Sequence, residues 1–66
     1  MFTKENITFI IKEYSYALVA SGEVNTKLIQ NSCLLELKRN GITTKDISKR
    51  EILDAIQSGI LLAMQN

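Results

Sequence analysis

The sequence predicts an all-α fold: one small domain of three helices, residues 1–66, that forms an intertwined or side-by-side homodimer. Three observations favour this fold. Apolar residues recur at steps of three and four in three separate segments, which is the spacing of one helix face. A residue that can cap a helix precedes each segment, and a glycine follows the first two. We therefore expect helices over about 4–20, 27–39 and 49–63.

The first helix is expected over residues 4–20, with Thr3 as its N-cap. Most of its apolar residues form one stripe, while others lie beside that stripe and make a second flank partly apolar. The stripe contains Ile7, Ile10, Ile11, Tyr14 and Leu18, and the residues beside it are Phe9, Tyr16 and Val19. Gly22 then fits the left-handed position that ends a helix.

The second helix is expected over residues 27–39, capped by Asn25 or Thr26. Its apolar residues cover more than half of the helical wheel, which predicts a central place in the fold. These residues are Leu28, Ile29, Cys33, Leu34, Leu35 and Leu37. Lys38 and Arg39 occupy the last turn, where positive charge is favoured by the helix dipole, and Gly41 ends the helix.

The third helix, expected over residues 49–63, follows a Ser-x-x-Glu capping box formed by Ser48 and Glu51. In such a box the serine hydroxyl accepts from the glutamate amide, and the glutamate side chain accepts from the serine amide. An apolar run with helical spacing follows, containing Ile52, Leu53, Ala55, Ile56, Ile60 and Met64. In the preceding connection, Thr43 with Asp46 predicts a short helical turn.

The composition limits what can stabilise so short a chain. A chain of 66 residues buries only about 60% of the surface that its unfolded form exposes. Cys33 is the only cysteine and there is no histidine, so an intrachain disulfide is excluded and a zinc site is disfavoured. We expect no cofactor. Helix packing and oligomerisation remain as the main sources of stability.

We expect a cytoplasmic protein with no membrane association. The longest apolar run, 60–64, is far shorter than the ~20 residues of a membrane span. Lys12, Glu13 and Tyr14 interrupt the first twenty residues, which therefore lack the apolar core of a signal peptide. A lone free thiol also agrees with a reducing compartment.

The residue types do not form a recognisable catalytic arrangement. Cys33 lies on the apolar side of the second helix, and the chain has no histidine to act as its base. The carboxylates are scattered, and most lie next to a lysine or arginine. We therefore expect a buried, structural cysteine and a protein that is not an enzyme.

Small residues recur every fourth position on the third helix, at Ala55, Gly59 and Ala63. Such a line lets another helix backbone approach closely. Two interpretations stay open: a crossing with another helix of the same chain, or the seam of a homodimer. The glycine costs about 1 kcal/mol inside a helix, which favours a packing role. The predicted dimer interface contains Ala55, Ile56, Gly59, Ile60, Leu62 and Ala63.

Five basic residues gather around the second connection, against only Asp46 and Glu51, for a local charge of +3. They are Lys38, Arg39, Lys45, Lys49 and Arg50. The arrangement of helix, glycine turn and helix resembles a helix-turn-helix, in which the start of the second helix contacts DNA. The alternative is a solvated loop rim, because this charge is modest for a DNA-binding domain.

Part of the sequence resembles the AriR/YmgB family of small bacterial regulators. The resemblance is carried by Ser21-Gly22-Glu23-Val24-Asn25-Thr26-Lys27-Leu28-Ile29, by the leucine- and glutamate-rich helix after it, and by Lys49-Arg50-Glu51-Ile52-Leu53. It spans about two thirds of the chain. The resemblance implies an all-helical dimer that acts as a cytoplasmic regulator or connector, through a protein partner and possibly DNA.

The leading hypothesis for function is a small regulatory adaptor that binds, as a homodimer, to a larger bacterial protein. Phe2, Phe9 and Tyr16 are the predicted partner-binding residues, because they lie outside the expected core. The alternative is a small DNA-binding transcriptional regulator that uses the five basic residues. A further alternative is a structural subunit or chaperone of a phage or secretion assembly.

Overall fold

The computed structural model describes residues 2–65, which form three α-helices and no strand. Helix α1 is Lys4–Ala20, α2 is Thr26–Arg39 and α3 is Lys49–Gln65. The predicted three-helix, all-α fold is confirmed. The predicted bounds of α1 match those observed, α2 begins one residue earlier than predicted, and α3 continues two residues beyond 63.

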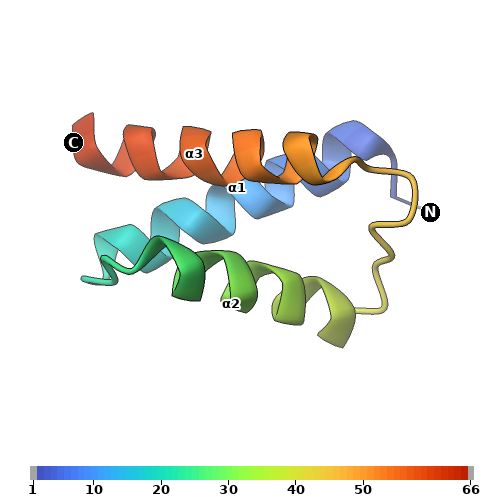
Figure 1. Ribbon diagram of the computed structural model, residues 1–66, viewed down its shortest axis with the longest axis horizontal. Helices are drawn as coiled ribbons and strands as arrows, with labels where there is room; N and C mark the ends of the chain where they lie inside the picture. The colour runs from blue at the N-terminus through green and yellow to red at the C-terminus, as the bar shows by residue number, and fades with distance from the viewer. Residues whose placement is uncertain (1, 66) are drawn as a thin grey trace.

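The helices run up and down and form a bundle of 31 × 19 × 18 Å. Helix α1 packs chiefly against α3 and makes fewer contacts with α2, while α2 and α3 contact each other least. Figure 1 shows that the start of α1, the end of α2 and the start of α3 share one end of the molecule. The topology therefore brings the N-terminal segment beside the α2–α3 connection.

Side-chain caps fix the start of each helix. Thr3 accepts from the amide of Asn6 at 3.1 Å, and the Asn6 side chain accepts from the Thr3 amide at 3.3 Å. Asn25, rather than Thr26, caps α2 through the amide of Leu28. The capping box at the start of α3 is present in both directions, each hydrogen bond being 3.1 Å long. Local sequence thus determines where each helix begins.

Helices α1 and α2 end in the same way, through a Schellman motif. The amide of Glu23 donates to the Leu18 carbonyl at 3.0 Å, and the amide of Ile42 donates to the Leu37 carbonyl at 2.9 Å. Each motif needs a residue with positive φ before the donor, and Gly22 supplies +107°. Gly41 supplies +70° in the second motif. A side chain at either glycine would strain the backbone.

The core is lined by the stripes of all three helices and closed by the connection between α2 and α3. Its buried apolar residues are Ile7, Ile11, Ile29, Cys33, Leu37, Ile47, Ile52, Ala55 and Ile56. The connection forms a single hydrogen-bonded turn, from the Ile47 amide to the Thr44 carbonyl, in place of the helical turn predicted from Thr43 and Asp46. This turn directs Ile47 into the core, where it is buried.

Three small residues, one from each helix, lie at the crossing of α1 with α2 and α3. Ser15 of α1 is 0% exposed, and its hydroxyl donates to the Ile11 carbonyl at 2.7 Å. Its oxygen also lies 3.3 Å from the sulfur of Cys33 in α2. A Cβ placed on Gly59 of α3 would lie 2.8 Å from the Cβ of Ser15. The small size of these residues therefore allows the helices to approach closely.

Candidate protein-binding surfaces

The line of small residues on α3 packs against α1 of the same chain. A Cβ at Gly59 would meet the carbonyl oxygen of Lys12 and would lie 3.1 Å from the amide nitrogen of Tyr16. Ala55 and Ile56 are buried in the same protomer. Of the two interpretations of this line, the structure shows the crossing within the chain.

The residues of the predicted dimer interface therefore fall into two groups, those already covered within the protomer and those still accessible. Ala55, Ile56 and Gly59 present no free surface to a second copy, because α1 and the core already cover them. Ile60 and Ala63 are half-buried, and Leu62 is exposed. The homodimer itself stays a prediction, and a second copy that packs on α3 has to use the outer side of that helix.

Helix α3 carries a mostly apolar stripe on its outer side, which we call the α3 outer stripe: Leu53, Leu61 and Met64, with Gln57 between them. At 100° per residue these positions fall within an arc of about 80°. Leu53, Leu61 and Met64 are 40%, 49% and 72% exposed. Residues 55–65 include no charged residue. The protomer therefore leaves this helix face partly exposed, and most exposed at Met64.

A second exposed apolar surface is a groove between α1 and α2, which we call the α1–α2 groove. It has a volume of about 510 Å³ and is open to solvent. Helix α1 supplies most of its wall, and the end of α2 supplies the opposite rim. The lining residues are Phe2, Phe9, Ile10, Glu13, Tyr14, Ala17, Glu36, Asn40 and Ile42.

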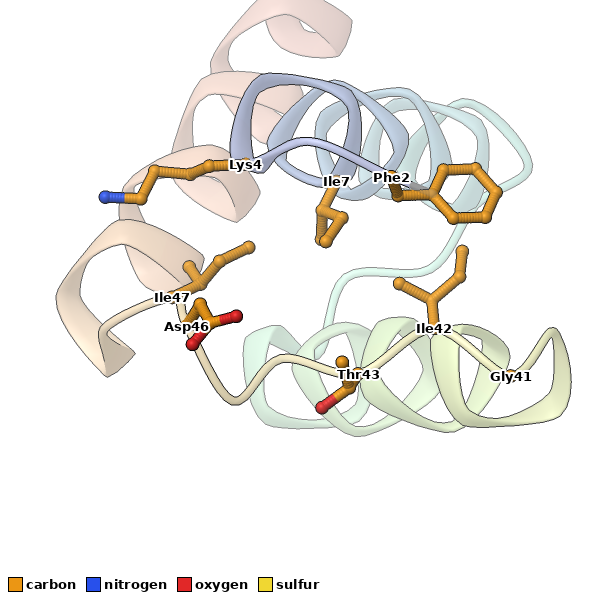
Figure 2. Close-up of a pocket in the computed structure, with 8 residues that line it drawn as sticks. All are labelled: Phe2, Lys4, Ile7, Gly41, Ile42, Thr43, Asp46 and Ile47. Carbon is orange, nitrogen blue, oxygen red and sulfur yellow. The ribbon is translucent and has the colours of Figure 1, made fainter.

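The groove adjoins a smaller pocket of about 310 Å³ under the N-terminal segment. Figure 2 shows Ile42 directed toward the ring of Phe2, with Ile7 and Ile47 pointing into the pocket from α1 and the connection. Phe2 and Ile42 line both cavities and separate them. Lys4 points away, and its ammonium nitrogen lies 3.0 Å from a carboxylate oxygen of Glu51.

Two of the three predicted partner-binding residues lie together. Phe2 and Phe9 line the α1–α2 groove and are 52% and 60% exposed. Tyr16 is half-buried, is not among the groove residues, and has its backbone beside Gly59. The structure therefore brings the phenylalanines to one surface and places the tyrosine elsewhere on α1.

Sequence reasoning missed the rest of the groove. It assigned Ile10 and Tyr14 to the core stripe, and both do pack against the core, but they are half-buried and also line the groove. It also did not identify Glu13 and Glu36, the two carboxylates of the rim. A usable signal was the spacing along α1, because residues 9, 13 and 17 recur every fourth position beside the apolar pair 10 and 14.

The five basic residues of the nucleic-acid alternative are all exposed. The topology places their segments at the end of the bundle that holds the α2–α3 connection (Figure 1). Arg39 lies 3.7 Å from Glu36 of its own helix. The connection, residues 40–48, has nine residues, against the three or four of a helix-turn-helix. The helices that flank it run antiparallel, so this geometry differs from that motif.

The pKa values of two groups, the Cys33 thiol and the Glu51 carboxyl, are shifted for structural reasons. Burial raises the pKa of the Cys33 thiol, and the hydrogen bond with Ser15 offsets this rise only in part. A raised pKa keeps the thiol protonated and unreactive. Beside the start of α3, the Lys4 ammonium and the Ser48 cap lower the pKa of Glu51. Neither group faces the α1–α2 groove.

Residues 2–65 contain neither a metal-binding cluster nor a helix suited to crossing a membrane. Within this range no group of three or more His, Cys, Asp or Glu side chains is placed to hold a metal ion. None of the three described helices is both long enough and apolar enough to cross a membrane.

Comparisons with known proteins leave the function to be argued from these surfaces. No protein-family model matches the chain, and neither a curated protein nor a solved structure matches it significantly. The resemblance to the AriR/YmgB family therefore stays a prediction that rests on its short motifs.

Proposed function

We propose that this protein is a small, non-enzymatic regulatory adaptor of the bacterial cytoplasm that acts as a homodimer by binding another protein. The observation that supports this proposal is the amount of apolar side chain left outside the core. Nine large hydrophobic residues are 37% to 89% exposed in residues 2–65. Contiguous exposed apolar surface is typical of protein-binding sites. The resemblance to small bacterial connector proteins points to the same role.

The charges around the two apolar surfaces favour a different partner for each surface. A twofold dimer brings the same patch of two copies together, so the patch must not repel itself. The α3 outer stripe satisfies this condition, because no charged residue lies within 55–65. The α1–α2 groove does not, because Glu13 and Glu36 stand on its rim. We therefore assign the stripe to the second copy and the groove to the partner protein.

The α3 outer stripe also has a suitable symmetry for a twofold dimer. If two copies of α3 pack antiparallel with Gln57 at the centre, Leu53 of each copy lies opposite Leu61 of the other. Arg50 then lies opposite Met64, so no like charges meet. Spacings of four and three residues keep these positions on one helix face. This register is the specific form of the dimer that we propose.

DNA binding is the second candidate, and one observation favours it. Five exposed basic side chains belong to segments at one end of the bundle. Against it stand the nine-residue connection and the acidic residues nearby, Glu36 among them. Phosphate contacts release counterions, so DNA binding by this end would weaken steeply as salt is added. A structural subunit or chaperone of a larger assembly would use the apolar surfaces instead.

The experiment that tests the proposal is a tagged pull-down from native lysate, with half of the sample treated with nuclease. Three variants accompany the wild type: Phe9→Ser in the groove, Lys45→Glu with Lys49→Glu at the basic end, and Glu5→Gln as a control. We expect a defined protein that survives nuclease, is lost with Phe9→Ser, and is retained by the other two variants. Recovery that requires nucleic acid and the two basic residues would overturn the adaptor proposal.

A further inference from the structure

The α1–α2 groove has the dimensions of a short stretch of helix. Its wall on α1 extends from Phe9 to Ala17, eight steps of 1.5 Å or about 12 Å. A helix that docks through positions i, i+4 and i+7 spans about 10.5 Å. The groove is open along its length, so it suits a chain segment rather than an enclosed small molecule. Helix-in-groove recognition uses an apolar face of this length.

The charges that line the groove are all of one sign. Its floor is apolar, and the two charged residues among its described lining residues are acidic: Glu13 from α1 and Glu36 from α2. Glu13 has no ion pair in the described part of the chain. One carboxylate oxygen of Glu36 lies 3.7 Å from Arg39, in a pair whose side chains are 34% and 72% exposed, and the other accepts from the Asn40 side-chain amide at 3.2 Å. Such an exposed ion pair contributes little, so the oxygen that faces Arg39 can take another cation as its partner.

We propose that the α1–α2 groove binds an amphipathic helix that carries lysine or arginine on both flanks of its apolar face. This inference rests on the proposed function, because it defines the partner chemistry of the same surface. The apolar residues of the helix cover Phe9, Ile10 and Tyr14, and its basic residues pair with the glutamates on either rim. Opposite charges on the two surfaces steer the encounter and select the partner.

A second copy of this chain fits the groove less well. Its exposed apolar stripe, on α3, has a single basic residue, Arg50, at one end and none along residues 55–65. It can therefore satisfy one glutamate at most. Two grooves placed face to face would bring four carboxylates together, which is unfavourable. A basic amphipathic helix from another protein satisfies both rims at once.

The test uses the full chain and two synthetic peptides of about 14 residues, or four helical turns. Both carry leucine at i, i+4, i+7 and i+11; one has lysine on both flanks of the leucines, and the other has glutamate there. Binding is measured by isothermal titration calorimetry at low and high salt, and sedimentation equilibrium gives the mass of each protein sample. The variants are Phe9→Ser, Glu13→Gln with Glu36→Gln, and Glu5→Gln as a matched control outside the groove.

We expect the lysine peptide to bind and the glutamate peptide to bind at least tenfold more weakly. The double glutamine variant should weaken the lysine peptide about threefold to tenfold and flatten its salt dependence. Phe9→Ser should weaken it by tenfold or more, since a central aromatic contributes most of such an interface. Glu5→Gln should leave binding unchanged. Circular dichroism shows that each variant is folded.

Three results would overturn the inference: no binding of the lysine peptide, equal binding of both peptides, or binding that is insensitive to Phe9→Ser. Stronger self-association of the double glutamine variant would also overturn it, because a second copy would then occupy the groove. The sedimentation data separate these failures from a failure of the proposed function. A dimer without peptide binding leaves the homodimer standing, whereas a monomer that binds the peptide removes the homodimer and keeps the groove.

Discussion

Replacing Gly59 with alanine tests the packing at the centre of the bundle. The added Cβ would lie 2.8 Å from the Cβ of Ser15, and ordinary contacts begin at 3.4 Å, so α1 must move by at least 0.6 Å. It would also meet the Lys12 carbonyl oxygen, which is backbone and cannot rotate away. A gap of 0.5–1 Å removes roughly a quarter to a half of the dispersion energy of the facing atoms.

Two opposing terms set the size of the effect. Alanine stabilises a helix interior by about 1 kcal/mol relative to glycine. Overpacking costs about 1–3 kcal/mol, and the rigid backbone contact places this site at the upper end. The net result is a loss of about 2 kcal/mol in the free energy of unfolding. For a domain of this size that lowers Tm by about 8–16 °C.

Thermal unfolding followed by circular dichroism measures this shift. Ser58→Ala is the matched control, because Ser58 is the exposed neighbour on the same helix and its replacement should change Tm by only a few degrees. A Gly59→Ala variant as stable as the wild type would refute the close crossing of α1 and α3. If its Tm loss instead depended on protein concentration, the glycine would lie in a dimer seam.

Three other predictions address separate parts of the molecule. Lys4 and Ser48 lower the pKa of Glu51 below its ordinary 4.5, so their contacts with the Glu51 carboxylate stabilise the fold above that pH and lose this effect as pH falls through the lowered pKa. Between neutral pH and about pH 3, Tm should therefore fall less in Glu51→Gln than in the wild type. Parallel curves of Tm against pH would contradict this prediction. Burial and the raised pKa of Cys33 should slow alkylation of its thiol about 100-fold or more relative to the unfolded chain. Mass spectrometry follows the rate of alkylation, and rapid labelling would show that the core is open. Gln57→Cys should form a symmetric disulfide dimer on oxidation, which a non-reducing gel detects. Asn31→Cys, on the exposed side of α2, should not form one. Equal cross-linking of both variants would contradict the proposed register.

The helices were predictable because local chemistry determines them. Caps and glycines lie within a few residues of the groups that they serve, so Ser48 with Glu51, and Gly41 after α2, mark helix ends in the sequence alone. The core stripe of α1 followed from the same spacing. Its polar member, Ser15, was missed, because a buried serine looks like a surface residue until its partner Cys33 is placed.

The surfaces were harder to predict, because they depend on how the helices are arranged. The residues that flank Gly59 show that a helix packs there, but not whether that helix is α1 or a second copy. The α1–α2 groove combines positions of α1 with the end of α2 and the residue that follows Gly41. Phe2 and Phe9 were identified from their place outside the stripe. The carboxylates of the rim, Glu13 and Glu36, become neighbours of one groove only in three dimensions.

Sedimentation equilibrium of the wild-type chain tests most directly the central claim, that exposed apolar surface serves association. The comparison variants are Leu61→Gln with Met64→Gln on the α3 outer stripe, and Val24→Gln, which alters an apolar residue that is 89% exposed in the first connection. The account predicts a dimer mass for the wild type and for Val24→Gln, and a monomer mass for the double variant with unchanged helix content. A wild type that stays monomeric at every concentration would contradict the account.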